Sequence, residues 1–123
     1  MPVDTTIDNA PPIIRHEVRG TIGVGEISIA MRQSIENPTL NVLCVLTKAI
    51  LSPELKECVE PTRRLMRLNK RRLPQTKHAF VVESRIEHAL VESWLSTLSP
   101  PWPWVIFQDV GTAMDWLSKS DAW

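Results

Sequence analysis

Residues 45–57 of the chain read VLTKAILSPELKE and connect a predicted buried strand to a predicted helix through a short loop. The strand covers residues 40–46, LNVLCVL, a short apolar run bounded by turn-forming residues, which is typical of a central strand covered on both faces. The helix begins at Ser52, because Ser, Pro and Glu are favoured at an N-cap and the two positions after it. The stretch therefore predicts a strand-to-helix unit within an α/β domain.

The N-terminal side continues the same alternation. Residues 3–8 and 12–18 are predicted strands joined by a turn rich in Asp, Asn and Pro. Residues 24–36 form a predicted helix, with Gly23 as the N-cap and Glu26 in the place of a capping-box acid.

The C-terminal side adds two more strands, residues 77–83 and 104–107, and each is followed by a helix. These helices begin after Ser84, which with Glu87 forms a capping box, and after Asp109. The resulting order, ββαβαβαβα, predicts an α/β fold with a mixed, mostly parallel sheet of about five strands, four helices and one antiparallel edge hairpin.

The spacing of apolar residues predicts the inner face of each helix. Pro61 interrupts the second helix, which runs to about Asn69, and either kinks it at Glu60 or opens a separate helix. The predicted inner faces are Ile27, Ala30, Met31 and Ile35; Leu55, Cys58, Val59, Thr62, Leu65 and Met66; Ile86, Ala89, Leu90 and Ser93; and Val110, Ala113, Met114 and Leu117.

Composition indicates one globular domain over residues 1–123, with residues 1–11 as its N-terminal strand and turn. Hydrophobic residues make up 43% and charged residues 23%, and fourteen basic side chains balance fourteen acidic ones. A zero net charge gives no reason to expect nucleic acid as a partner, and the apolar runs are too short for membrane insertion. Residues 1–12 lack the pattern of a signal peptide, so we expect a cytoplasmic protein.

The two cysteines, Cys44 and Cys58, fall in apolar surroundings and are interpreted as small buried hydrophobic residues of a reducing compartment. His88 and Glu92 lie four apart on one predicted helix, but two ligands do not make a metal site. With no phosphate-binding glycine loop and no nucleophile elbow, we expect no cofactor, no metal and no enzymatic activity.

Ser52 is the first candidate for a regulatory site. A helix N-terminus favours a phosphate group, so phosphorylation or partner binding there is one interpretation. The alternative is an ordinary N-cap, and it is favoured because Glu54 would repel a phosphate and Pro53 supplies no N–H. The preceding loop, with Thr47 and Lys48, and the start of the helix at Glu54 complete this candidate surface.

A run of basic residues follows on the second helix and forms a predicted stripe that fits an acidic protein surface or an anionic ligand. A solvated helix face with Glu60 paired to Arg64 is the alternative, and it is favoured. The stripe consists of Arg63, Arg64, Arg67, Lys70 and Arg71.

Two tryptophans, Trp102 and Trp104, flank the last predicted strand in the sequence WPW. Tryptophan is enriched at binding hot spots, so an exposed pair here would mark a partner surface. The alternative, more frequent in small domains, is that they close the rim of the core.

Four segments carry a resemblance to the STAS/SpoIIAA-like family of small bacterial α/β domains. VIFQDVGTAMDWL, at residues 105–117, is similar to the family's closing strand and helix, and LSPELKECVEPTRRLMRL, at residues 51–68, resembles its second helix. ISIAMRQSIENPTLNVLCVL, at residues 27–46, and VVESRIEHALVESW, at residues 81–94, resemble the units before and after that helix.

The resemblance implies a stand-alone, uncharacterised branch of the family rather than its kinase-switched members. Their Asp-Ser-Ser-Gly-type motif is reduced here to Ser52 within AILSPEL, and Leu46 and Thr47 replace an acidic residue at the strand end. It implies a protein-interaction or signalling module with a protein partner, and leaves a homodimer open. The alternative is a carrier of a small apolar or anionic ligand, similar to lipid-carrying Sec14-like domains, which requires a cavity between helices and sheet.

Overall fold

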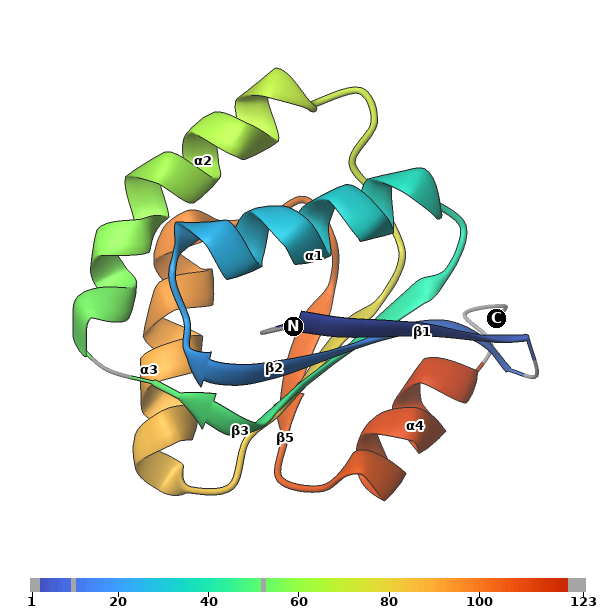
Figure 1. The fold of residues 1–123 in the computed structure, drawn as a ribbon. Helices are drawn as coiled ribbons and strands as arrows, with labels where there is room; N and C mark the ends of the chain where they lie inside the picture. Colours follow the sequence, from blue (N-terminus) through green and yellow to red (C-terminus); the bar gives the residue numbers. More distant parts are fainter. Residues whose placement is uncertain (1–2, 10, 52, 120–123) are drawn as a thin grey trace.

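The computed structural model describes residues 3–9, 11–51 and 53–119, which form a twisted sheet with helices on both faces (Figure 1). The predicted α/β class and the order ββαβαβαβα are confirmed. In chain order the elements are β1 (Val3–Asn9), β2 (Pro12–Thr21), α1 (Val24–Glu36), β3 (Asn41–Ile50), the 3₁₀ segment η1 (Pro53–Cys58), α2 (Val59–Leu68), β4 (His78–Val81), α3 (Arg85–Leu98), β5 (Trp104–Phe107) and α4 (Val110–Ser118).

The strands lie side by side in the order in which they occur along the chain, β1-β2-β3-β4-β5. β1 and β2 form the predicted antiparallel hairpin, and the remaining neighbours pair in parallel. Each crossover from β2 onward therefore adds a strand in the same direction. Because such crossovers are right-handed, their helices α1, α2 and α3 all fall on one side of the sheet.

The three helices do not form a single layer on that side of the sheet. α1 and α3 pack against the sheet, and α2 makes its main helix contacts with these two helices and lies over them (Figure 1). α4 covers the opposite face, against β3 and β4.

Strand β3 is longer than the predicted strand 40–46. It runs to Ile50 because β2 continues beside it, with Lys48 opposite Arg19 and Ile50 opposite Thr21. The predicted loop at residues 47–51 is therefore mostly strand, and the partner strand extends beyond its predicted end at residue 18. Gly20, at a φ of 75°, lies within β2, next to an irregularity in the pairing.

The predicted second helix is divided in two. Its first part is the 3₁₀ segment η1, and α2 begins at Val59 with Cys58 as N-cap. Pro61 is the third residue of α2, where the missing N–H is one of those that have no partner within a helix. The interpretation with two helical pieces is therefore the correct one, with the break two residues before Pro61. Ser52, the predicted N-cap, lies outside the described residues.

The predicted inner face of α3 is wrong. Ile86 is 76% exposed, and Ala89 and Ser93 are also exposed. The buried residues of this helix are Val91, Leu95 and Leu98, with Trp94 partly buried beside them. The predicted and the observed sets both have helical spacing, so the sequence pattern is compatible with either face of α3 packing inward. In the structure, the face with the larger apolar side chains packs against the sheet.

Candidate ligand cavity

A hollow of about 110 Å³ lies between the sheet and the helices α1, α2 and α3. Its floor consists of alternate residues of three adjacent strands: His16 and Val18, Val42 and Cys44, and His78 and Phe80. These residues share one face because side chains alternate along a strand. The hollow is the space left where α2 lies over α1 and α3 instead of against the strands.

The inner face of α1 borders this cavity. Ile27, Ala30 and Met31 belong to the predicted inner face and line the hollow. Each of them is only partly buried, whereas Ile35, further along the same face, is buried in a separate cluster with Met66 and Leu73. The predicted face is thus correct in direction, but three of its four residues border the hollow and only Ile35 is buried in a packed core cluster.

His16 lies in the cavity wall, and both of its ring nitrogens have partners. Nδ1 is 3.0 Å from Thr5 Oγ1, and Nε2 is 2.9 Å from Ser34 Oγ. Burial lowers the pKa of His16 to about 4, because the charged imidazolium would lose its hydration. The ring is therefore neutral at pH 7 and ties β1 and α1 to β2.

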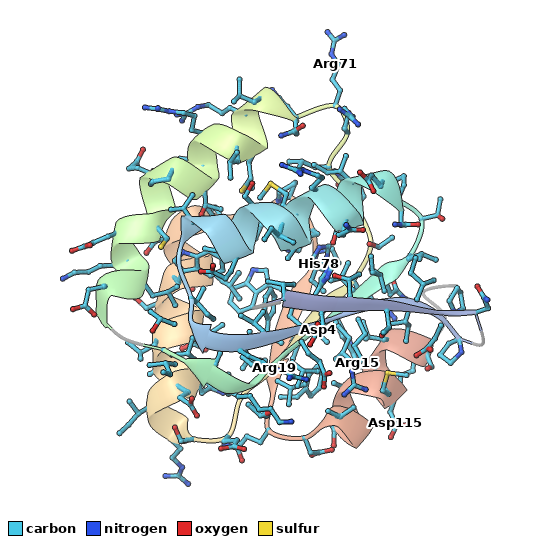
Figure 2. All side chains as sticks on the ribbon, viewed as in Figure 1. Asp4, Arg15, Arg19, Arg71, His78 and Asp115 are labelled. Carbon is cyan, nitrogen blue, oxygen red and sulfur yellow. The ribbon has the colours of Figure 1, made fainter. Side chains whose placement is uncertain are left out.

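His78 is the second buried histidine of the wall, inside the fold as Figure 2 shows. Its Nδ1 is 3.0 Å from the carbonyl oxygen of Thr76, which can only accept, so Nδ1 carries the proton and Nε2 is an acceptor. Burial lowers the pKa of His78 to about 3, with a smaller contribution from His16 and an opposing one from the Thr76 bond. This ring too is neutral at pH 7.

The cavity consequently holds little charge. Burial raises the pKa of Cys44 to about 12, so its thiol stays protonated. Among the described residues that line the hollow, Glu26 is the one with a formal charge at pH 7, and its Oε1 accepts a hydrogen bond from the Gly23 N–H. No described lysine or arginine lines it.

Three residues of the cavity lining carry a buried polar atom that has no hydrogen-bond partner in the described part of the chain. The atoms are Thr62 Oγ1 of α2, Trp94 Nε1 of α3 and Trp102 Nε1 of the segment after α3. A fourth such atom, Thr76 Oγ1, belongs to a residue outside the cavity lining. Each of these atoms has less than 1 Å² of accessible surface, so the surface of the hollow itself is almost entirely apolar.

The residues of the predicted surface around the second helix lie in two different elements, β3 and η1. Thr47 and Lys48 are in β3 rather than in a loop, and Lys48 is exposed. Glu54 is exposed in η1. Ser52 is not among the described residues, so its role as cap or phosphorylation site stays a prediction.

The predicted basic stripe does not form one helix face. α2 ends at Leu68, so Lys70 and Arg71 lie in the following turn, where Arg71 extends away from the molecule (Figure 2). Arg63 bonds the Thr97 carbonyl of α3 at 2.7 Å and pairs with Glu60, the residue that the sequence analysis assigned to Arg64. Arg64 and Arg67 are exposed on α2.

The two tryptophans of WPW differ in position. Trp102 lines the cavity and stacks on His78, with ring centroids 4.2 Å apart. Trp104 is partly buried against the main core cluster. These contacts favour the interpretation that Trp102 and Trp104 close the rim of the core over the interpretation that they form an exposed pair.

His16, His78 and Trp94 line the cavity but were not among the predicted site residues. Thr62 was predicted on the inner face of the second helix and is buried there. For His16 a signal was present, because it alternates with Ile14 and Val18 in a strand whose inner face is otherwise apolar.

Two further features bear on the expected classes of function. No group of three or more His, Cys, Asp or Glu residues in the described ranges is arranged to hold a metal ion. Within the same ranges, no helix combines the length and the apolarity needed to cross a bilayer. His88 Nε2 and Glu92 Oε2 lie 3.6 Å apart on the surface of α3.

Comparisons with known proteins identify the fold. No family model matches the chain, and no curated protein matches it. Among solved structures, it is similar to an uncharacterised protein of the DUF3478 family from Shewanella loihica PV-4, which has a SpoIIAA-like fold. The TM-score is 0.61 at 12% sequence identity, over 94% of this chain and 91% of the other. At this identity the likeness concerns the fold alone.

Proposed function

We propose that this chain, an α/β domain of SpoIIAA-like fold, binds a small apolar molecule in the cavity beneath α2 and acts by binding rather than by catalysis. The observation that supports the proposal is a hollow of about 110 Å³ with predominantly apolar walls, at the junction of three helices and the sheet. Protein cores are normally close-packed, and voids larger than a water molecule are few.

Keeping such a hollow empty has an energetic cost. The hollow is partly open to solvent, so its apolar wall stays in contact with water until a ligand covers it, at about 25 cal/mol per Å² of apolar surface. A ligand that fills the space restores the missing contacts. We therefore expect the domain to be more stable with an apolar ligand in the hollow than without one.

The volume limits the ligand. Drug-sized sites measure roughly 300–1,000 Å³, and an engineered apolar cavity of about 150 Å³ holds one benzene molecule. The hollow here accordingly suits a molecule of about five or six carbon atoms, or one end of a longer molecule for which α2 moves outward. The family resemblance suggests a carrier of a lipid-like ligand. The volume of the hollow limits the enclosed part of that ligand to a small group.

The test uses cyclopentane as a probe and two alanine-to-leucine variants. Ala30 of α1 lines the cavity, so Ala30→Leu fills it, whereas Ala89 of α3 is exposed and Ala89→Leu is the matched control. Cyclopentane is expected to raise the melting temperature of the parent protein and of Ala89→Leu, because a ligand that binds only the folded state stabilises it. It is expected to leave Ala30→Leu unaffected.

Two results would contradict the proposal. If cyclopentane does not stabilise the parent protein, the cavity is not a binding site for apolar molecules. If it stabilises Ala30→Leu equally, the probe binds elsewhere. The melting temperatures without ligand show whether Ala30→Leu itself folds.

A second candidate is the protein-interaction module implied by the family resemblance, and one observation favours it. Leu68, at the end of α2, is 76% exposed, and Arg64, Arg67, Lys70 and Arg71 nearby are also exposed. An apolar side chain among basic ones suits an acidic protein partner, because charges guide the encounter and the apolar contact adds affinity.

Crosslinking in cells tests this second candidate. Leu68→Asp is expected to abolish a specific crosslinked species, whereas Ile86→Asp, at an equally exposed residue of α3, is expected to retain it. Equal crosslinking of both variants and the parent would exclude this surface.

A further inference from the structure

A second hollow, of about 360 Å³, lies between α1 and the C-terminal part of α2, and its chemistry differs from that of the apolar cavity. We call it the α1–α2 groove. Arg32 and Glu36 of α1 and Arg72 of the turn after α2 line it, and all three side chains are exposed. Its remaining lining residues are Ser28, Met31, Ile35, Leu65 and Asn69.

The charged side chains of the α1–α2 groove are not used by the fold. The guanidinium groups of Arg32 and Arg72 form no hydrogen bond or ion pair with any described residue. Glu36 follows Arg32 by four residues, a spacing that permits an ion pair, but the two are not paired in the described part of the chain. Two guanidinium groups from two different elements thus border one hollow with their donors unused.

Met31 borders both the cavity and the α1–α2 groove. On α1, Ile27 and Ala30 line the cavity, whereas Ser28 and Ile35 line the groove. At 100° per residue these pairs form neighbouring stripes of one helix, and Met31 lies where the stripes meet. Its unbranched side chain adopts alternative conformations readily. A ligand that extends out of the cavity past Met31 therefore reaches the groove.

The difference in charge between the two hollows orients such a ligand. A charged group in the cavity would lose its hydration and meet no cation, since no described lysine or arginine lines the cavity and both histidines are neutral at pH 7. In the groove, an anion meets Arg32 and Arg72, whose planar guanidinium groups match the geometry of a carboxylate. The apolar end therefore belongs in the cavity and the anionic end in the groove.

Glu36 limits the charge of the anionic end. With one carboxylate and two guanidinium groups, the side chains that line the α1–α2 groove carry a net charge of +1. This charge balances a carboxylate, whereas a phosphate monoester carries about −1.5 to −2 at pH 7.

We infer that the ligand of this protein is an amphipathic carboxylate, with the end of its alkyl chain in the cavity and its head group bound by Arg32 and Arg72 in the α1–α2 groove. This inference rests on the proposed function, and it adds the class of the ligand and a second part of the binding site.

Three probes with the same eight-carbon chain separate the head group from the chain. Octanoate is negative, octan-1-ol is neutral and octylammonium is positive, and dissociation constants are measured for each. The parent protein is expected to bind octanoate about tenfold more tightly than octan-1-ol, and octylammonium less tightly than octan-1-ol. Added salt is expected to weaken the binding of octanoate and to leave octan-1-ol unaffected.

Three variants of the groove test the position of the head group with opposite signs. Arg32→Gln and Arg72→Gln are each expected to weaken octanoate about threefold, whereas Glu36→Gln is expected to strengthen it about twofold. None of the three should change the affinity for octan-1-ol. Arg85→Gln is the matched control, because Arg85 is exposed at the start of α3 and lines neither hollow. All four residues are exposed, so these variants are expected to fold.

The outcomes distinguish the inference from the proposed function. If octan-1-ol binds as tightly as octanoate, or if Arg32→Gln and Arg72→Gln leave octanoate unaffected, the head group is not bound in the groove and the inference fails, although apolar binding stands. If Ala30→Leu, which fills the cavity, binds octanoate as tightly as the parent protein, the chain lies elsewhere and the inference also fails. If neither cyclopentane nor octanoate binds the folded parent protein, the proposed function fails with it.

Discussion

The imidazole of His78 stacks on the indole of Trp102, with the ring centroids 4.2 Å apart and the planes inclined by 12°. The backbone reinforces this contact, because the His78 N–H donates to the Pro103 carbonyl at 2.9 Å and His78 pairs with Trp104 in the sheet. The segment between α3 and β5 is thereby tied to β4, and Trp102 is fixed in the cavity wall.

The two neutral histidines make folding stability depend on pH. Burial lowers the pKa of His16 to about 4 and that of His78 to about 3, below the value of 6.5 in the unfolded chain. Between pH 4.5 and 6 the unfolded chain therefore binds more protons. The histidine contribution is complete above pH 6.5 and is lost as the pH falls towards the folded pKa values.

Replacement of His78 tests this effect. His78→Phe keeps an aromatic ring against Trp102 and removes one titrating group. Between pH 4.5 and 6, the slope of the unfolding free energy against pH is expected to fall by up to about 1.4 kcal/mol per pH unit relative to the parent protein. Urea unfolding at several pH values measures it, and an unchanged slope would mean that His78 is not held neutral.

Lys77 and Asn41 connect α4 to the sheet. The Lys77 ammonium, on a residue that is only 6% exposed, donates to the carbonyls of Trp116 at 3.0 Å and of Lys119 at 2.7 Å. Asn41 donates to the Leu117 carbonyl at 2.8 Å and accepts from the Lys77 N–H. A side chain of β3 and one from the residue before β4 thus satisfy carbonyls that the end of a helix leaves without partners.

Loss of the ammonium is expected to destabilise the fold. Lys77→Met keeps most of the aliphatic chain and removes the charge-assisted hydrogen bonds, so the unfolding free energy should fall by about 2 kcal/mol. Lys48→Met, at an exposed residue of β3, should change it by less than about 0.5 kcal/mol. Equal effects of the two changes in chemical denaturation would contradict the role assigned to Lys77.

Arg63 and Arg64 are adjacent in sequence but differ in their contacts. Arg63 joins α2 to α3 through the Thr97 carbonyl, whereas Arg64 is exposed. Arg63→Ala is expected to lower the unfolding free energy by about 1 kcal/mol, a modest value because the side chain is 36% exposed, and Arg64→Ala by less than about 0.5 kcal/mol. A larger loss of unfolding free energy for Arg64→Ala than for Arg63→Ala would contradict this assignment and support the Glu60–Arg64 pair predicted from the sequence.

Local signals in the sequence were sufficient for much of the fold. The cap residues Ser84 and Asp109 each accept the expected backbone N–H, and α1, β5 and the inner face of α4 agree with the predicted positions. These features depend on residues within a few positions of one another. The phase of α3 and the length of β3 depend instead on contacts with distant segments, which a single sequence does not reveal.

The cavity could not be predicted from the sequence for a similar reason. It lies where consecutive strand order directs three helices to one side of the sheet and α2 lies over the other two, and that order is a property of the assembled sheet. Thr62, Trp94 and Trp102 come from α2, α3 and the segment after it, and only the fold brings them around one hollow. Ser52 and the basic residues attracted attention because their signals are local.

A crystal structure of the protein soaked in cyclopentane tests the central claim most directly. The account predicts density for one ring between the sheet and helices α1, α2 and α3. A cavity without density at saturating cyclopentane, or a ring bound only elsewhere on the protein, would contradict it.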